Sequence, residues 1–82
     1  MYYEYARKIV AEELIDAKRF TVGNEYTEIQ TNSNYLNNLS PVDIEKIIRQ
    51  FELDGKLKII SASKVLNSYD VYVLEIPDIS YF

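Results

Sequence analysis

The stretch LSPVDIEKIIRQFELDGKLKII, residues 39–60, decides the fold of this 82-residue chain. Ser40 is a residue type that caps helices, Pro41 suits a first helical position, and Asp43 follows the cap by three residues. The apolar residues that come next recur with the period of one helical face. They predict a helix whose buried side consists of Ile44, Ile47, Ile48 and Phe51.

A two-stranded hairpin should follow this helix. Asp54-Gly55 ends the helix, because glycine readily takes the left-handed conformation just past a helical end. Alternation of apolar and polar residues then predicts a strand at Lys56–Ser61 and a return strand at Tyr69–Ile76. The buried side of the return strand should carry Tyr72, Leu74 and Ile76, and the connecting loop should be Ala62–Ser68, with a turn at Asn67-Ser68.

The N-terminal half predicts two further helices and one strand. A first helix is expected over Tyr2–Arg19, with one broad apolar face made of Tyr2, Tyr3, Ala6, Ile9, Val10, Leu14, Ala17 and Phe20. The strand is expected near residues 20–22, with residues 25–30 as the alternative, since 25–31 also suits one helical turn. A second helix should include Tyr35, Leu36 and Leu39. Its four neighbouring asparagines are poor helix formers, which leaves an elongated loop as the alternative.

The succession over residues 39–76 resembles the winged helix-turn-helix superfamily: a Leu-Ser-Pro turn, a helix, an acidic-Gly corner and a two-stranded wing. The resemblance implies an α+β fold of three helices and a small antiparallel β-sheet, forming one domain over residues 1–82. The superfamily contains both DNA readers and protein-binding modules, so the resemblance implies a fold more strongly than a function.

Composition excludes most chemistry. The chain has no cysteine and no histidine, which removes thiolate and imidazole catalysis and most zinc sites. Ser61-Ala-Ser-Lys64 matches an S-x-x-K pattern, but the chain is far too short for the hydrolases that use it. We therefore expect no enzymatic activity, no cofactor and no metal. The sequence shows no signal-peptide pattern and no apolar stretch near the ~20 residues that span a bilayer, which predicts a cytoplasmic protein without a membrane segment.

Charge gives a mixed indication about nucleic acid. The net charge is −4, whereas nucleic-acid binders usually carry a basic surplus. Positive residues nevertheless gather between positions 46 and 64, on the outer side of the helix and in the hairpin. If the chain binds DNA, the contacts should come from Lys46, Arg49, Gln50, Lys56, Lys58 and Lys64. Asp43 and Glu45 oppose that contact, so the affinity should be weak and should call for a homodimer or a partner.

Aromatic residues at both ends of the chain favour a protein partner instead. Tyrosine is enriched at interfaces because it buries much area at low entropic cost. Glu13 falls inside the apolar arc of the first helix, where it is either hydrogen-bonded, partner-facing or extended to solvent. For Tyr2 and Phe82 the simpler expectation is that the two termini pack on each other. The candidate protein-interface residues are Tyr2, Tyr3, Tyr5, Glu13, Tyr81 and Phe82.

Two functions follow from these patterns. The first is a small DNA-associated regulator of transcription or of a mobile or phage element, acting as a homodimer. The alternative is an acidic protein-binding module or inhibitor that docks on a nucleic-acid-handling complex.

Overall fold

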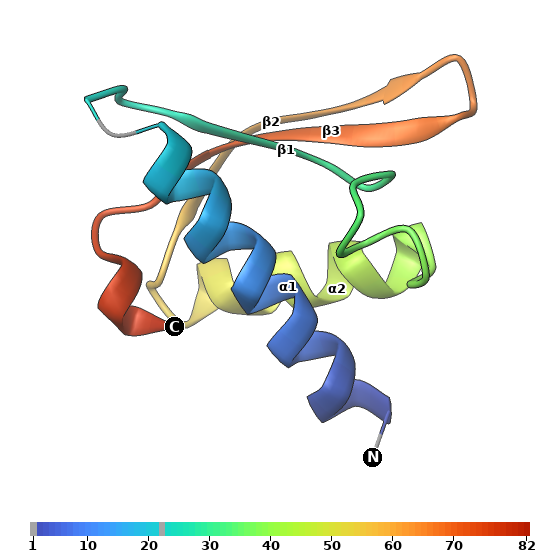
Figure 1. Cartoon of the computed structure of the whole chain (residues 1–82), viewed down its shortest axis with the longest axis horizontal. Coiled ribbons are helices and arrows are strands. Elements are labelled where there is room, and N and C mark those ends of the chain that lie inside the picture. The colour runs from blue at the N-terminus through green and yellow to red at the C-terminus, as the bar shows by residue number, and fades with distance from the viewer. Residues whose placement is uncertain (1, 22) are drawn as a thin grey trace.

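Two helices cover one face of a three-stranded antiparallel sheet in the computed structural model, which describes residues 2–21 and 23–82 (Figure 1). The strand order in the sheet is β1-β3-β2. A short 3-10 helix follows the last strand. The elements are α1 (Tyr2–Phe20), β1 (Thr27–Gln30), α2 (Pro41–Leu53), β2 (Lys58–Val65), β3 (Tyr69–Glu75) and η1 (Ile79–Tyr81).

The expected second helix is absent from the described residues, so the prediction of a three-helix winged helix-turn-helix is wrong. Residues 31–39 form successive turns, in which Ser33 accepts hydrogen bonds from the N–H groups of Leu36 and Asn37. Leu36 and Leu39 are buried and hold these turns to the core. The asparagines around them offer the backbone side-chain partners that compete with helical hydrogen bonds, which explains why no helix forms.

The helix predicted after Ser40 is confirmed as α2. The Ser40 hydroxyl accepts a hydrogen bond from the backbone N–H of Asp43 at 3.1 Å, as a capping residue should. All four residues of the predicted face, Ile44, Ile47, Ile48 and Phe51, are buried. Gly55 has a φ of 77°, which confirms the left-handed stop. Just beyond it, the Glu52 carboxylate accepts the Ile59 N–H at 2.8 Å and ties α2 to β2.

Helix α1 packs its middle on the core and leaves both ends free. Ala6, Val10 and Leu14 are fully buried, as its apolar face predicts. The prediction fails at the ends of that face, because Tyr2 and Tyr3 are exposed and Phe20 is 91% exposed. Figure 1 shows that the first turns of α1 extend past the other elements, which explains the exposure at the N-terminal end of the helix.

The strand that follows α1 lies at the second of its two predicted positions. Phe20 ends α1 and Thr21 begins a turn, so the strand expected at residues 20–22 does not form there; its last residue, Val22, lies outside the described residues. Strand β1 pairs with β3 instead, with Thr27 opposite Leu74 and Ile29 opposite Tyr72. The two β1 residues are buried and complete the inner face of the sheet.

The hairpin is longer and its turn tighter than predicted. Strand β2 continues to Val65, through most of the expected loop, with a register shift between Ile59 and Ser61 that marks a bulge. The turn is closed by a hydrogen bond from Ser68 N–H to Val65 O at 2.7 Å. Its central residues, Leu66 and Asn67, have φ values of 45° and 64°. Three residues, Leu66–Ser68, separate the paired Val65 and Tyr69. Positive φ at Leu66 and Asn67 suits the twist of a tight hairpin turn, but a leucine adopts it at a cost.

Phe51 joins the distant parts of the chain. Its ring makes an edge-on contact with Phe82, with a centroid distance of 5.0 Å. The cations of Arg7 and Lys56 lie 5.0 and 5.9 Å from the same centroid. Phe82 packs on the core, as predicted, and its contact there is Phe51. Tyr2 is exposed, so the prediction that Tyr2 and Phe82 pack on each other is wrong.

We predict that Phe51→Ala lowers the free energy of unfolding by about 3–5 kcal/mol, the usual effect of truncating a buried aromatic residue. Chemical denaturation measures the change. Leu53→Ala is the matched control, because Leu53 lies on the same helix and is 80% exposed. A loss below about 1 kcal/mol for Phe51→Ala would show that the ring is not part of the core.

We also predict that Leu66→Asn combined with Asn67→Gly stabilises the protein by about 1 kcal/mol, because these residues adopt positive φ more easily. Leu66→Ala separates the conformational effect from the removal of an exposed leucine. Alanine keeps the Cβ atom, so it should give no comparable gain in thermal or chemical unfolding. Equal stabilisation by both changes would contradict strain in the turn as its source.

Candidate functional site

The outer side of α2 and the hairpin enclose a cleft of about 220 Å³, here called the α2–hairpin cleft. Of the six residues predicted to contact nucleic acid, the structure brings two, Arg49 and Lys64, to its walls. Lys46 is exposed on the same helix but does not line the cleft. The cleft is lined by Glu45, Arg49, Ala62, Ser63, Lys64, Asp70 and Tyr72.

Both cations of the α2–hairpin cleft are paired with carboxylates. Arg49 Nε lies 2.8 Å from Glu45 Oε2, one helical turn away. Lys64 Nζ lies 3.4 Å from Asp70 Oδ1 across the hairpin. Hydrogen bonding to Glu45 and its charge raise the pKa of Arg49, so the guanidinium stays ionised. The walls thus present alternating charges, with no basic surplus.

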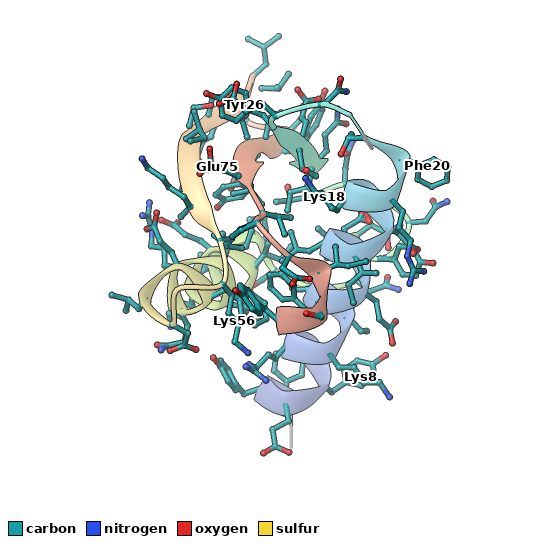
Figure 2. The ribbon with its side chains drawn as sticks, turned by 90° about the vertical axis from the view of Figure 1, so that its left-hand side faces the viewer. Lys8, Lys18, Phe20, Tyr26, Lys56 and Glu75 are labelled. Carbon is teal, nitrogen blue, oxygen red and sulfur yellow. The ribbon has the colours of Figure 1, made fainter. Side chains whose placement is uncertain are left out.

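The other predicted nucleic-acid residues do not form one surface with the cleft. The side-chain amide of Gln50 donates a hydrogen bond to Asp54 at 3.1 Å. The amide group that was predicted to contact a base is therefore already engaged. Lys56 lies over the Phe51 ring, beyond the end of α2 (Figure 2). Lys58 stands opposite Glu75 in the sheet register.

The net charge of this surface determines how strongly it could attract DNA. Lys46, Arg49 and Lys64 contribute three positive charges, and the nearby carboxylates of α2 and the hairpin balance them: Asp43, Glu45 and Asp70. DNA affinity comes largely from counterions released when cations neutralise phosphates. A surface without net positive charge gains little from that release. The geometry therefore weakens the nucleic-acid interpretation.

Tyr72 forms the floor of the α2–hairpin cleft. It is 2% exposed, in agreement with the prediction that it belongs to the buried side of the return strand. Burial, followed by the charges of Glu45 and Asp70, raises the pKa of Tyr72 to about 12. Its hydroxyl is therefore neutral at physiological pH.

The predicted aromatic interface residues of α1 are open to solvent. We call Tyr2, Tyr3 and Tyr5, the exposed tyrosines of the first turns of α1, the tyrosine patch; their exposed fractions are 57, 47 and 61%. Helical spacing puts Tyr2 and Tyr5 on one side of α1 and Tyr3 on another. They occupy the part of α1 that projects beyond the other elements (Figure 1). Burial raises the pKa of Tyr2, and the charge of Asp43 and hydrogen bonding to it add to the rise, so Tyr2 is the member of the patch that lies near the start of α2. Val42, at that start, is also exposed.

The two C-terminal candidates have different roles. Tyr81 is half-exposed and borders a hollow of about 230 Å³ with Asp54, Gly55 and Lys56. Phe82 is engaged in its contact with Phe51, so it serves the core and is not free for a partner.

Glu13 lies in a second depression, which we call the α1 groove. The groove has a volume of about 440 Å³ and separates the C-terminal half of α1 from the turns after β1. Glu13 is the one lining residue that was predicted to lie at an interface. The other helix residues of the groove recur at the spacing of one helical face, which could have identified them. The groove is lined by Glu13, Asp16, Ala17, Phe20, Ser33, Asn34 and Tyr35.

The environment of Glu13 disfavours its charge. Burial is the main cause that raises the pKa of Glu13, the negative charge of Asp16 adds to it, and hydrogen bonding to Ser33 opposes both. Glu13 is half-buried in the groove, and its role as an interface residue stays a prediction. Hydrogen bonding to Asp16, followed by its charge, raises the pKa of Tyr35 on the opposite wall.

We predict that Glu13→Gln increases the free energy of unfolding at pH 7. A raised pKa means that the folded protein holds this proton to higher pH than the unfolded chain does. The wild type therefore loses stability as pH rises from the ordinary Glu value through the raised one. The advantage of glutamine should disappear at about pH 4, where Glu13 is protonated in the folded state.

Urea denaturation at the two pH values tests this, with Glu4→Gln as the control for net charge because Glu4 is exposed at the start of the same helix. Destabilisation by Glu13→Gln at pH 7 would show that the hydrogen bond to Ser33 outweighs the cost of burial.

Comparisons with protein-family models, with curated proteins and with solved structures found no match. Within residues 2–21 and 23–82, no group of three or more acidic, cysteine or histidine side chains could hold a metal ion. No helix in the same ranges is long and apolar enough to cross a membrane. The function must therefore be argued from the surfaces just described.

Proposed function

We propose that the protein is a non-catalytic protein-binding module of the cytoplasm, which contacts its partner through the tyrosine patch. The observation that carries the proposal is the exposure of Tyr2, Tyr3 and Tyr5 on a helical end that projects from the molecule. Exposed aromatic residues that cluster on a protruding element have no role in the core. They suit an interface, where a tyrosine buries a large apolar ring and keeps its hydroxyl available for hydrogen bonding.

The charge distribution supports a protein partner over a polyanion. The chain carries −4 overall, and the surface predicted to contact DNA is locally neutral. Nonspecific DNA binding depends on an electrostatic term that this balance nearly removes. The acidic protein-binding alternative of the sequence analysis thus becomes the leading interpretation.

A second candidate function is weak DNA association through a homodimer. The observation that favours it is that Lys46, Arg49 and Lys64 lie on or beside the same cleft. Exposed ion pairs contribute only about 0–1 kcal/mol, so phosphates could displace Glu45 and Asp70 from their partners. A homodimer would double the number of such contacts.

Fluorescence anisotropy with a random DNA duplex separates the two functions. We expect the wild type to show no salt-sensitive binding even at about 50 mM salt, and Lys46→Glu with Arg49→Glu to change nothing. If DNA binds instead, the logarithm of its affinity should fall with the logarithm of salt with a slope near −0.9 per phosphate neutralised. Loss of that binding in the double variant would establish the second candidate.

Photo-crosslinking tests the tyrosine patch directly. Replacing Tyr5 by a benzophenone amino acid should yield one discrete adduct in the native cells. The matched control carries the same group at Tyr26, which is likewise exposed but lies at the far end of the sheet from the patch (Figures 1 and 2). We expect the adduct at position 5 to disappear when Tyr2→Ser is added. Equal adducts at positions 5 and 26 would contradict a defined interface at α1.

A further inference from the structure

We propose that the α1 groove binds a cationic side chain, lysine or arginine, of a protein partner. The inference rests on the proposed function and adds the chemistry of the partner. It concerns a different surface from the tyrosine patch, so the two can be tested apart.

The walls of the α1 groove combine carboxylates with aromatic rings. Glu13 and Asp16 lie one helical turn apart on α1, and Phe20 follows on the same face. Tyr35 faces them from the turns after β1. Carboxylates beside aromatic faces are the combination that recognises ammonium and guanidinium groups, through charge and through the electron-rich faces of the rings.

The acidic side chains of the α1 groove are not neutralised by the ion pairs of the fold. The two ion pairs formed within the described part of the chain belong to Arg49 and Lys64, on other elements. Glu13 is moreover partly buried, and burial of a carboxylate without an opposite charge costs free energy. A bound cation would remove part of that cost. The groove therefore suits a positive group, and none of the ion pairs among residues 2–21 and 23–82 supplies one.

Phe20 is an exposed aromatic residue at the edge of the α1 groove. It follows the apolar period of α1, yet it is 91% exposed and points away from the body of the molecule at the end of the helix (Figure 2). Together with Tyr35, which is half-exposed, it gives the α1 groove an apolar rim. That rim suits the aliphatic stem of a lysine or arginine, whose charged end then reaches the carboxylates.

A metal ion fits the α1 groove less well. Only two carboxylates line it, and in the described ranges no group of three or more potential ligands was found. Hard divalent cations usually require six or more oxygen ligands and gain nothing from aromatic rings. The lining therefore favours an organic cation.

Titration of the ¹⁵N-labelled 82-residue chain with N-acetyl-arginine amide tests the proposal. The matched control ligand is N-acetyl-citrulline amide, which has nearly the same shape and no charge. We expect the arginine probe to shift amide signals of residues 12–20 and 32–36 and the citrulline probe to leave them unchanged. Shifts of equal size with both probes, or shifts spread evenly over the acidic surface, would overturn the proposal.

Variants then assign the binding to individual walls of the groove. Asp16→Asn and Glu13→Gln should each weaken binding of the arginine probe about two- to fivefold, the range of exposed ion pairs. Glu4→Gln removes the same charge from the exposed start of α1 and should leave the affinity unchanged. Phe20→Ala should weaken binding about two- to fivefold without any change of charge. An equal loss of affinity in Glu4→Gln would show that the probe responds only to the net charge of the protein, and would overturn the proposed site.

A longer probe tests whether the cation that binds the groove belongs to a protein segment. An acetylated tripeptide Ala-Arg-Ala amide should bind at least as tightly as the single amino acid derivative if the natural ligand is a protein segment. Weaker binding of the tripeptide would reject a protein side chain. If the groove binds arginine but position 5 forms no adduct, the proposed interface at the tyrosine patch fails and the groove stands. If the adduct forms but arginine does not bind, only this inference fails.

Discussion

The packing of Phe51 is the interaction on which the rest of the structure depends. Its ring lies where α1, the end of α2 and the C-terminal segment meet, with Phe82 edge-on and two cations nearby. Three parts of the chain far apart in sequence therefore share one apolar contact. Gly55 follows at once and turns the chain into β2, while Glu52 fastens that corner through the Ile59 N–H. The orientation of the sheet on α2 is set there.

How far sequence predicts this protein depends on the range of the forces involved. The capping by Ser40, the buried face of α2 and the stop at Gly55 all act within a few residues, and all were predicted correctly. The turns of residues 31–39 were predicted wrongly as a helix. The asparagines favour turns in the local backbone, and the burial of Leu36 and Leu39 depends on contacts with distant parts of the chain. Phe20 shows a related limit: helical period tells which side a residue is on, but not where the neighbouring surface ends.

The candidate surfaces show the same division. The outer position of Arg49 on α2 could be predicted, and its pairing with Glu45 was readable from a spacing of one turn. The pairing of Lys64 with Asp70 could not, because it requires the hairpin register, and the turn proved shorter than expected. Glu13 was noticed because it interrupts an apolar face. Tyr35, which completes the groove, comes from a segment whose predicted helix does not exist. A helical wheel predicts which residues share one side of a helix, but it cannot predict a surface to which a second segment of the chain contributes.

The place of β1 in the sheet has a consequence for the order of folding. Helix α2 and the β2–β3 hairpin are consecutive and can assemble through short loops, whereas β1 must find β3 across the whole of that unit. The hydrogen bond from Asp70 N–H to the Thr31 hydroxyl joins residues 39 positions apart. Closing so long a loop costs more entropy than closing the hairpin, and only a four-residue strand repays it. Loop-closure entropy therefore favours the docking of β1 after the β2–β3 hairpin has formed.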